Sequence, residues 1–405
     1  MTGTVFLGLI YLTFISLGLP DPLLGTAWPV MRLELGASLD AAGILSVIIS
    51  GGTIVSSLCC GRLLERWGAG KVTACSVLLT AGALTLSSVS PSLLPLGLAA
   101  LPLGLGGGAV DAALNNFVAL RYTPRHMSWL HCFWGVGAFA GPLIIARWLS
   151  RGDNWRGAYL TLGLIQSGVS LLLFMSLPLW DRPQAGRGGE QRGQEEAGPQ
   201  GGRAGAGGKK NVLRIPGVPQ TLAMFFMYCA FEYIIGLWGA SFLIEARGFA
   251  KADAARALAL YFMGITAGRF GTGFLTMRLN GGALIRVGLA VISAGSLLLL
   301  LPLPPPLAPL ALLIIGLGCA PVYPSIIHLT PERFGPANSS RIIGLEMACA
   351  YCGSTFMPPL AGFAAARTSM AVIPAILLCC GAAMLFMSEK IHKAVKTRKQ
   401  GSMIR

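Results

Sequence analysis

The sequence predicts an all-α membrane protein with twelve transmembrane helices, arranged as two pseudo-symmetric bundles of six. Three observations support this fold class. Only 12% of the 405 residues are charged and 54% are hydrophobic, whereas a soluble domain carries about 25% charged residues. Apolar runs long enough to cross a bilayer recur along the chain. One long hydrophilic segment divides these runs into two equal sets, which is the outline of a two-bundle carrier.

The first half of the chain contains six apolar runs of roughly the 20 residues that a helix needs to cross about 30 Å of hydrocarbon. They lie near residues 5–31, 40–60, 71–90, 93–120, 127–149 and 157–180. The first run contains Pro20 and Pro22 on either side of Asp21. Because proline removes a backbone donor, we expect this helix to kink or break beside the acidic side chain.

Residues 181–216 are rich in Gly, Arg, Glu and Gln and contain almost no large apolar side chains. A segment of this composition cannot bury a core, so we expect a disordered linker. Six further apolar runs follow it, near residues 218–244, 253–277, 282–302, 306–329, 340–366 and 370–388. We therefore expect an N-terminal bundle at 1–180, the linker at 181–216, a C-terminal bundle at 217–391 and a basic tail at 392–405.

The formal net charge of +15 would suit a protein that binds nucleic acid. The basic residues lie in turns between apolar runs rather than along one soluble face, so we expect no nucleic-acid partner. Lys and Arg gather in the turns after even-numbered runs, in the linker and in the tail. By the positive-inside rule, both termini and the linker then lie in the cytoplasm. We expect a monomer in the plasma (inner) membrane.

The chain contains ten cysteines. Most lie in apolar runs, where free Cys behaves as a small hydrophobic residue, and no Cys/His pattern has metal-ligand spacing. No sequence motif of an intramembrane protease or hydrolase is present. We therefore predict that the protein is not an enzyme and uses no metal or cofactor. A purely structural or receptor-like membrane protein is an alternative, which a measured transmembrane flux would exclude.

The turn between the second and third runs contains the segment Gly61–Lys71, which we expect to act as a cytoplasmic gate. Its glycines permit a sharp turn and close helix approach. Glu65 and Arg66 can form charge-assisted contacts that hold the cytoplasmic side closed in one state. A degenerate copy occupies the equivalent turn of the second half. The predicted gate residues are Gly61, Glu65, Arg66, Gly68, Lys71 and, from the degenerate copy, Arg278.

Carboxylates inside apolar runs are the most informative feature for function. A charged acid in hydrocarbon costs about 2.5–3.5 kcal/mol on insertion scales, so it persists where it lines a wet cavity, pairs with a cation or carries a proton. We expect Asp21, Asp111 and Glu232 to couple transport to protons, with Asp111 as first choice. Arg269 lies inside the eighth run and needs an anion. We expect a structural pair with Glu346, with Glu232 as the other acid available in that half and a substrate clamp as the alternative role for Arg269.

Polar and aromatic side chains near these acids are the predicted solute-binding residues. Asn115 is four residues after Asp111 and therefore shares its helix face. Tyr228 is four residues before Glu232 and shares the face of that acid. The prolines of segment 321–324 mark an irregular segment that can turn its tyrosine toward a cavity. For His131, a structural role with its ring hydrogen-bonded in the core is an equally favoured alternative. The full set is Asn115, His131, Trp134, Tyr228, Trp238 and Tyr323.

The two hydrophobic halves and the segment Gly61–Lys71 resemble the major facilitator superfamily. Within it, several segments resemble the fucose permease family of proton-coupled sugar symporters. The most specific is Gly106–Val118, which matches that family's helix-4 pattern of glycines, an acid, an Asn and Phe-Val. The other matches are Asp21–Leu24 in helix 1, His131, Phe133 and Gly137-Ala138 in helix 5, Tyr228 and Glu232 in helix 7, Gly268–Thr272 in helix 8, and Tyr323-Pro324 in helix 10.

This resemblance implies a carrier that moves a sugar or another small polar solute by alternating access, with Asp21 and Asp111 involved in proton coupling and solute binding. Its partners would be the solute, protons and the lipid bilayer. A sodium-coupled or uncoupled carrier uses the same fold, and replacing protons with sodium in vesicles would separate these cases. A drug or lipid exporter of the same fold is a further alternative, which resistance assays or a laterally open cleft would reveal.

Overall fold

The computed structural model describes residues 2–122, 124–180, 212–275, 279–302 and 304–403. Within these ranges all regular secondary structure is helical. The first half contains α1 (Thr2–Gly18), α2 (Leu23–Glu34), α3 (Ala41–Ser88), α4 (Leu93–Arg121), α5 (Pro124–Leu149) and α6 (Trp155–Trp180). The second half contains the short helix η1 (Val212–Arg214), α7 (Val218–Arg247), α8 (Lys251–Leu275), α9 (Gly281–Leu300), α10 (Leu307–Cys319), α11 (Val322–Phe334), α12 (Pro336–Arg367) and α13 (Val372–Met403).

Among the described residues, nine helical segments are long and apolar enough to cross a membrane. The longest is α3, whose 48 residues would reach about 72 Å at 1.5 Å each as one straight helix, more than twice the hydrocarbon thickness. Gly68 interrupts it with φ 77° and ψ 158°, in a region that favours glycine. This interruption lies in the predicted turn between the second and third crossings. The total of twelve crossings stays a prediction.

Prolines interrupt two of the crossings, and both interruptions were predicted. α1 ends at Gly18 and α2 begins at Leu23, which leaves Asp21 in the turn between them. In the same way, α10 ends at Cys319 and α11 begins at Val322. Both interruptions lie inside segments of membrane-spanning length. Backbone groups freed at such depth are tolerated only where protein or a water-filled cavity surrounds them.

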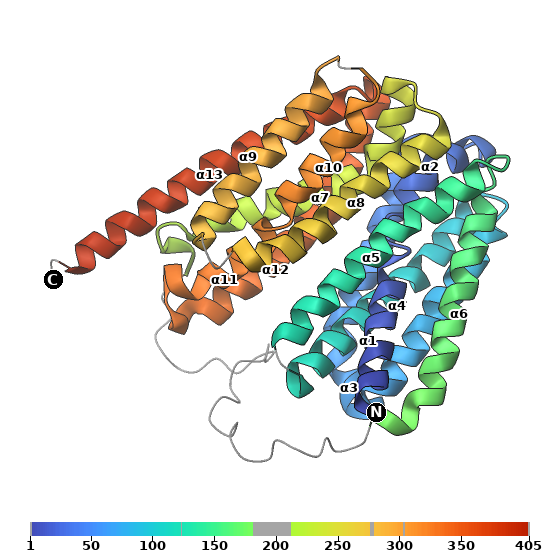
Figure 1. Cartoon of the computed structure of the whole chain (residues 1–405), viewed down its shortest axis with the longest axis horizontal. Helices are drawn as coiled ribbons and strands as arrows, with labels where there is room; N and C mark the ends of the chain where they lie inside the picture. Colours follow the sequence, from blue (N-terminus) through green and yellow to red (C-terminus); the bar gives the residue numbers. More distant parts are fainter. Residues whose placement is uncertain (1, 123, 181–211, 276–278, 303, 404–405) are drawn as a thin grey trace.

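The helices form two lobes, α1–α6 and α7–α13, each packed mainly within itself. Figure 1 shows the lobes close together at the end that carries the α2–α3 and α12–α13 connections, and spread apart toward the end at which α1 begins and α13 ends. Between the lobes, α5 packs against α8, α3 against α12, and α2 against both α7 and α8. The predicted all-α architecture of two bundles is confirmed.

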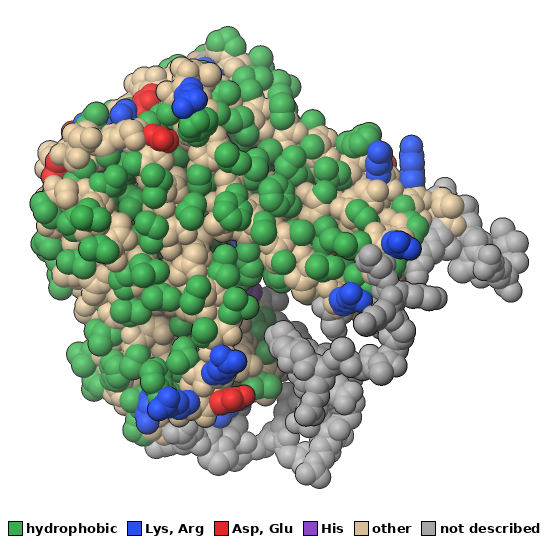
Figure 2. Space-filling model, turned by 180° about the vertical axis from the view of Figure 1, so that it is seen from behind, with side chains coloured by type: hydrophobic (Ala, Val, Ile, Leu, Met, Phe, Trp, Pro, Cys, Tyr) green, Lys and Arg blue, Asp and Glu red, His purple; other side chains and the backbone are tan. Residues whose placement is uncertain are grey.

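The predicted domain boundaries stay predictions. Most of the predicted linker, residues 181–211, lies outside the described residues. α13 continues without a break from Val372 to Met403, so the predicted tail begins inside a helix. Figure 2 shows hydrophobic side chains over the middle of the molecule, charged side chains gathered toward its ends, and a recess between the two lobes.

Two of the glycines between the lobes show how closely the helices approach. A Cβ atom added to Gly25 in α2 would lie 2.2 Å from the carbonyl oxygen of Gly236 in α7. One added to Gly135 in α5 would lie 2.3 Å from Oγ1 of Thr266 in α8. Small residues allow helices to approach closely inside a membrane. The absence of a side chain therefore sets the distance between the lobes at both places.

Candidate functional site

Asp21 is exposed, although it lies in the turn between α1 and α2 inside a membrane-length segment. Its Oδ2 accepts a 2.7 Å hydrogen bond from Nε1 of Trp134 on α5. α1 can approach α5 because Gly18 and Gly137 have no side chains. Added Cβ atoms would lie 2.1 Å from the carbonyl oxygen of Trp134 and 2.0 Å from that of Ile15, respectively. The break in the first crossing therefore places a carboxylate directly against α5.

Asp111 on α4 is half-buried, and its Oδ1 accepts a 2.9 Å hydrogen bond from Nδ2 of Asn115. The expectation that these two residues share one helix face is confirmed. Asp111 lies close enough to Asp21 for the two negative charges to act on each other. Among the described residues, neither Asp21 nor Asp111 has a Lys or Arg within ion-pair distance.

Glu232 on α7 forms an ion pair with Arg269 on α8, with 3.8 Å between Oε1 and Nη2. The guanidinium also lies 5.2 Å from the centroid of a Trp134 ring, within the range of a cation–π contact. Arg269 therefore contacts a residue of each lobe. We call Asp21, Asp111, Trp134, Glu232 and Arg269 the central polar cluster.

The predicted pair of Arg269 with Glu346 is wrong. Glu346 on α12 is fully buried, and its Oε1 accepts a 2.6 Å hydrogen bond from Oγ1 of Thr330 on α11. Its Oε2 has no hydrogen-bond partner among the described residues. α8 packs against α7 and α10, and this packing brings Arg269 to the acid on α7 instead.

Two other predicted residues lie at the edge of the central polar cluster. His131 on α5 is exposed, lies edge-on to Phe14 with 5.9 Å between ring centroids, and is within electrostatic range of Arg269. Its exposure favours a polar role over that of a satisfied core histidine. Tyr323 on α11 is half-buried and donates a weak 3.6 Å hydrogen bond to Sδ of Met347.

Two predicted solute-binding residues lie in the core in this conformation. Tyr228 on α7 is fully buried, and its hydroxyl donates a 2.9 Å hydrogen bond to the carbonyl oxygen of Cys319. Trp238 is also fully buried, and its Nε1 donates a 2.7 Å bond to the carbonyl oxygen of Pro358. Both polar groups are thus satisfied by backbone carbonyls. These side chains connect α7 to α10 and α12, and Tyr228 also lies against Glu232.

Two tyrosines outside the predicted set lie near the central polar cluster. Tyr233 on α7 is 51% exposed and lies within electrostatic range of Asp21 and Glu232. Tyr351 on α12 is 41% exposed and lies within range of Asp111. A tyrosine has an apolar ring and a polar hydroxyl, so a tyrosine inside an apolar run is a candidate residue for the edge of a water-filled cavity. That signal could have identified both residues.

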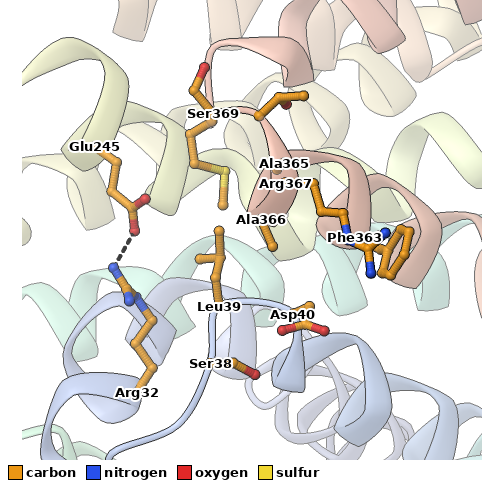
Figure 3. Close-up of a pocket in the computed structure, with 12 residues that line it drawn as sticks. Arg32, Ser38, Leu39, Asp40, Glu245, Phe363, Ala365, Ala366, Arg367 and Ser369 are labelled. Atoms are coloured by element: carbon orange, nitrogen blue, oxygen red, sulfur yellow. Dashed lines mark hydrogen bonds and ion pairs between the residues drawn. The ribbon is translucent and has the colours of Figure 1, made fainter.

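At the end where the lobes meet, two ion pairs join them. Arg32 at the end of α2 contacts Glu245 of α7, with 2.7 Å between Nη2 and Oε1. Lys251 at the start of α8 contacts Asp153 in the α5–α6 connection, with 2.5 Å between Nζ and Oδ2. A cavity of about 590 Å³ lies beside the first pair, and Figure 3 shows Arg32 and Glu245 pointing toward one another at its edge. This end is therefore closed by contacts between the lobes.

The predicted gate motif lies at the other end, where the lobes are apart. Gly61, Glu65, Arg66, Gly68 and Lys71 are all exposed. In the described part of the chain no ion pair involves Glu65 or Arg66. Among the residues that the structure describes, the expected contacts that would hold this end closed are therefore not formed. The predicted gate residue Arg278 lies outside the described residues.

An apolar groove of about 500 Å³ lies between α5 and α8. Its lining residues are Trp129, Cys132, Phe133, Val136 and Phe139 from α5, and Met263, Thr266, Ala267 and Phe270 from α8. Trp134 and Arg269 belong to the same two helices but do not line the groove. α5 therefore turns an apolar face to the groove and Trp134 to the central polar cluster.

The family model of the Major Facilitator Superfamily matches residues 6–345, which is most of the chain. The chain therefore belongs to the major facilitator superfamily. It is a multi-pass membrane transporter and not an enzyme, in agreement with the helical architecture and the polar residues at membrane depth.

Individual relatives are more distant. The Bypass of stop codon protein 6 of Saccharomyces cerevisiae (strain ATCC 204508 / S288c) is 23% identical over 404 residues, covering 93% of this chain and 80% of that protein. The nucleoside transporter NupG superposes with a TM-score of 0.68 at 14% identity, covering 96% of this chain and 98% of that one. A bacterial homolog of the human lysosomal transporter Spinster, in an inward-facing and occupied conformation, gives 0.63 at 12% identity, with 99% and 97% covered. Likeness at these identities establishes the fold alone.

Proposed function

We propose that this transporter is a proton-coupled symporter of a small polar solute, with a sugar as the first candidate. One observation carries the proposal. Asp21 and Asp111 lie inside membrane-length segments and each accepts a hydrogen bond from a neutral N–H group, with no Lys or Arg paired to either in the described part of the chain. A carboxylate charge without a cation is costly at membrane depth, and a bound proton relieves that cost.

The arrangement of the lobes supports alternating access, and we propose the plasma membrane as its location with both termini in the cytoplasm. The basic gate motif at Gly61–Lys71 would then face the cytoplasm, where the lobes are spread apart. The opposite end is closed by the Arg32–Glu245 and Lys251–Asp153 pairs. Rocking of the lobes would break these pairs and bring the gate motif against the second lobe.

The choice of a sugar rests on the resemblance to fucose permeases. Asn115, His131 and Tyr233 offer hydrogen-bonding groups, and the Trp134 ring offers an aromatic face, which together suit a polyhydroxylated ring. A nucleoside is the next candidate, because NupG, which has a similar fold, is a nucleoside transporter. A nucleoside combines ribose hydroxyls with a base that can stack on an aromatic side chain.

The proposal is tested in proteoliposomes containing the full chain, with labelled fucose, galactose, glucose, uridine and adenosine as probes. An acidic exterior should drive accumulation of at least one probe, and a protonophore should abolish it. Accumulation driven by a sodium gradient and indifferent to pH would assign sodium coupling instead. Equilibration without accumulation under either gradient would show an uncoupled carrier.

The apolar groove between α5 and α8 favours a second candidate, an exporter of lipid-like or drug-like amphiphiles. The groove would offer such molecules an apolar binding surface between the two lobes. Replacing Val136 with Trp should fill it. If the protein exports amphiphiles, Val136→Trp should block their movement, whereas a sugar or nucleoside carrier should keep its uptake.

A further inference from the structure

We propose that Trp134 is the positioning residue that transmits the protonation state of Asp21 to the Arg269–Glu232 pair, and so couples proton binding in one lobe to movement of the other. The inference rests on the proposed proton coupling. It deepens that function by naming the side chain through which the proton would act on the lobes.

Trp134 makes two contacts with two different parts of its indole. Its Nε1–H donates to Asp21 in the first lobe, over 2.7 Å. Its ring lies 5.2 Å from the guanidinium carbon of Arg269 in the second lobe. Arg269 in turn lies 3.8 Å from Glu232. The contact between the Trp134 ring and Arg269 is therefore the point at which this series of four side chains crosses between the lobes.

The two contacts of Trp134 strengthen each other while Asp21 is ionised. A hydrogen bond to a carboxylate is shorter and roughly twice as strong as one to a neutral acceptor. It polarises the donor, in the way that linked hydrogen bonds polarise one another, and this places more electron density on the indole face that attracts the guanidinium. Protonation of Asp21 weakens the hydrogen bond, and the ring then holds Arg269 less firmly.

Arg269 is placed to respond to such a change. Its separation from Glu232 exceeds the roughly 3.2 Å limit of a good hydrogen bond. The guanidinium is thus shared between an anion in its own lobe and an aromatic ring in the other. When the ring releases it, Arg269 moves fully to Glu232, and one attraction between the lobes is lost.

The position of Trp134 gives this change a mechanical effect. The next residue, Gly135, packs against Thr266 at one of the closest approaches between the lobes, and Arg269 is one helical turn beyond Thr266. Forming or breaking the contact between Trp134 and Arg269 therefore acts where α5 and α8 meet. The titratable and charged groups around Asp21 and Arg269 are Asp111 on α4, His131 and Cys132 on α5, Tyr228, Glu232 and Tyr233 on α7, and Cys319 on α10.

The test compares substitutions that remove one contact of Trp134 or both. Trp134→Phe keeps an aromatic ring beside Arg269 and removes the N–H donor, whereas Trp134→Leu removes both. Trp148→Phe is the matched control, because Trp148 also lies on α5 and donates a 3.0 Å bond to Oγ1 of Thr161 on α6, within one lobe. Asp21→Asn serves as the mimic of a protonated carboxyl group.

The readout is the distance between the lobes as a function of pH, measured by electron paramagnetic resonance on the full chain in lipid nanodiscs. Spin labels are introduced as unnatural amino acids at Arg62 and Lys393, two exposed residues of opposite lobes, so that the native cysteines stay. The wild type should shift its distance distribution with pH. Trp134→Phe should move the population ratio about tenfold toward that of Asp21→Asn and flatten the pH dependence. Trp148→Phe should behave as the wild type.

A wild-type pH profile in Trp134→Phe overturns the proposal, as does a wild-type protein whose lobe distance ignores pH. The double variant Glu232→Gln with Arg269→Gln removes the cation that contacts the Trp134 ring, together with its anionic partner, so that neither charge is left unpaired. It should also flatten the profile, and a wild-type response would again overturn the proposal. Uptake measurements distinguish a failure of the proposed Trp134 role from a failure of the proposed proton-coupled transport. If pH-gradient-driven uptake of a probe is intact in both the wild type and Trp134→Phe, this inference alone fails. If the wild type shows none, the proposed function fails.

Discussion

The indole N–H of Trp134 donates a 2.7 Å hydrogen bond to the carboxylate of Asp21, a residue 113 positions earlier in the chain. The same side chain contacts Arg269 of the second lobe with its ring. The proline-broken first crossing is thereby connected to α8 through one residue of α5. This connection joins the predicted proton-coupling acids to the interface on which the lobes would move.

Close packing of α5 on α8 should be necessary for transport. In Gly135→Ala the new Cβ would lie 2.3 Å from Oγ1 of Thr266, so the helices must separate. Overpacking of this kind costs about 1–3 kcal/mol, which corresponds to roughly a tenfold or larger effect on the affected conformation. We expect uptake to fall by about that factor while the protein still inserts and folds, as measured in proteoliposomes and by thermal unfolding.

The matched control for Gly135→Ala is Gly107→Ala on α4, where an added Cβ meets no heavy atom within 4 Å. It should leave uptake unchanged. The second substitution Thr266→Ala should recover part of the activity lost in Gly135→Ala, because it removes the nearest atom. Equal loss in both glycine variants would show that the contact with Thr266 is not the cause.

The ion pair between Arg32 and Glu245 should bias the molecule toward the conformation described here. Both side chains are partly exposed, at 23% and 29%, so solvent screening limits the pair to about 1 kcal/mol. Arg32→Ala should therefore raise the population with this end open by about two- to fivefold. Spin labels at Arg151 and Thr368, exposed residues of opposite lobes at this end, would measure the change.

A similar pair within one helix provides the comparison. Arg256 and Asp253 on α8 lie 2.7 Å apart, the same distance as the Arg32–Glu245 pair, but do not join the lobes. Arg256→Ala should leave the lobe distance unchanged. Exchanging the two charges, with Arg32→Glu and Glu245→Arg together, should restore the wild-type distribution. No change in Arg32→Ala would mean that Lys251 and Asp153 hold this end without help.

Glu346 should stabilise the second lobe without carrying transported protons. It is fully buried and accepts a hydrogen bond from Thr330. Glu346→Gln keeps an acceptor for that hydroxyl and should leave thermal unfolding close to the wild type. Glu346→Ala leaves a cavity and removes the acceptor, and it should cost about 1–3 kcal/mol. The exposed Glu389 supplies the control Glu389→Ala. Loss of pH-driven uptake in a stable Glu346→Gln protein would instead place this acid in the proton path.

Local features of the structure could be predicted from the sequence because short-range chemistry fixes them. Prolines predicted the break beside Asp21, and glycine at position 68 predicted a turn between two crossings. Helical spacing predicted that Asp111 and Asn115 share a face, and they are joined by a hydrogen bond. In each case the information lies within a few residues.

Contacts between distant helices could not be predicted in this way. Arg269 needed an anion, and two acids in its half were available. Only the packing of α8 against α7 determines that Glu232 is the partner of Arg269. Trp238 is of a residue type that often binds solutes, yet its indole N–H donates to a backbone carbonyl 120 positions away. A side chain's partner across the fold depends on helix rotation and neighbours, which a periodic apolar pattern does not record.

The central claim is that protons bound near Asp21 and Asp111 drive solute movement, and the most direct test compares two assays of Asp111→Asn in proteoliposomes. We predict that accumulation driven by a pH gradient is lost, because an amide cannot carry the proton, while exchange of labelled for unlabelled solute continues. Asp253→Asn, at an exposed position of α8, should keep both activities. Undiminished gradient-driven accumulation in Asp111→Asn would contradict the account.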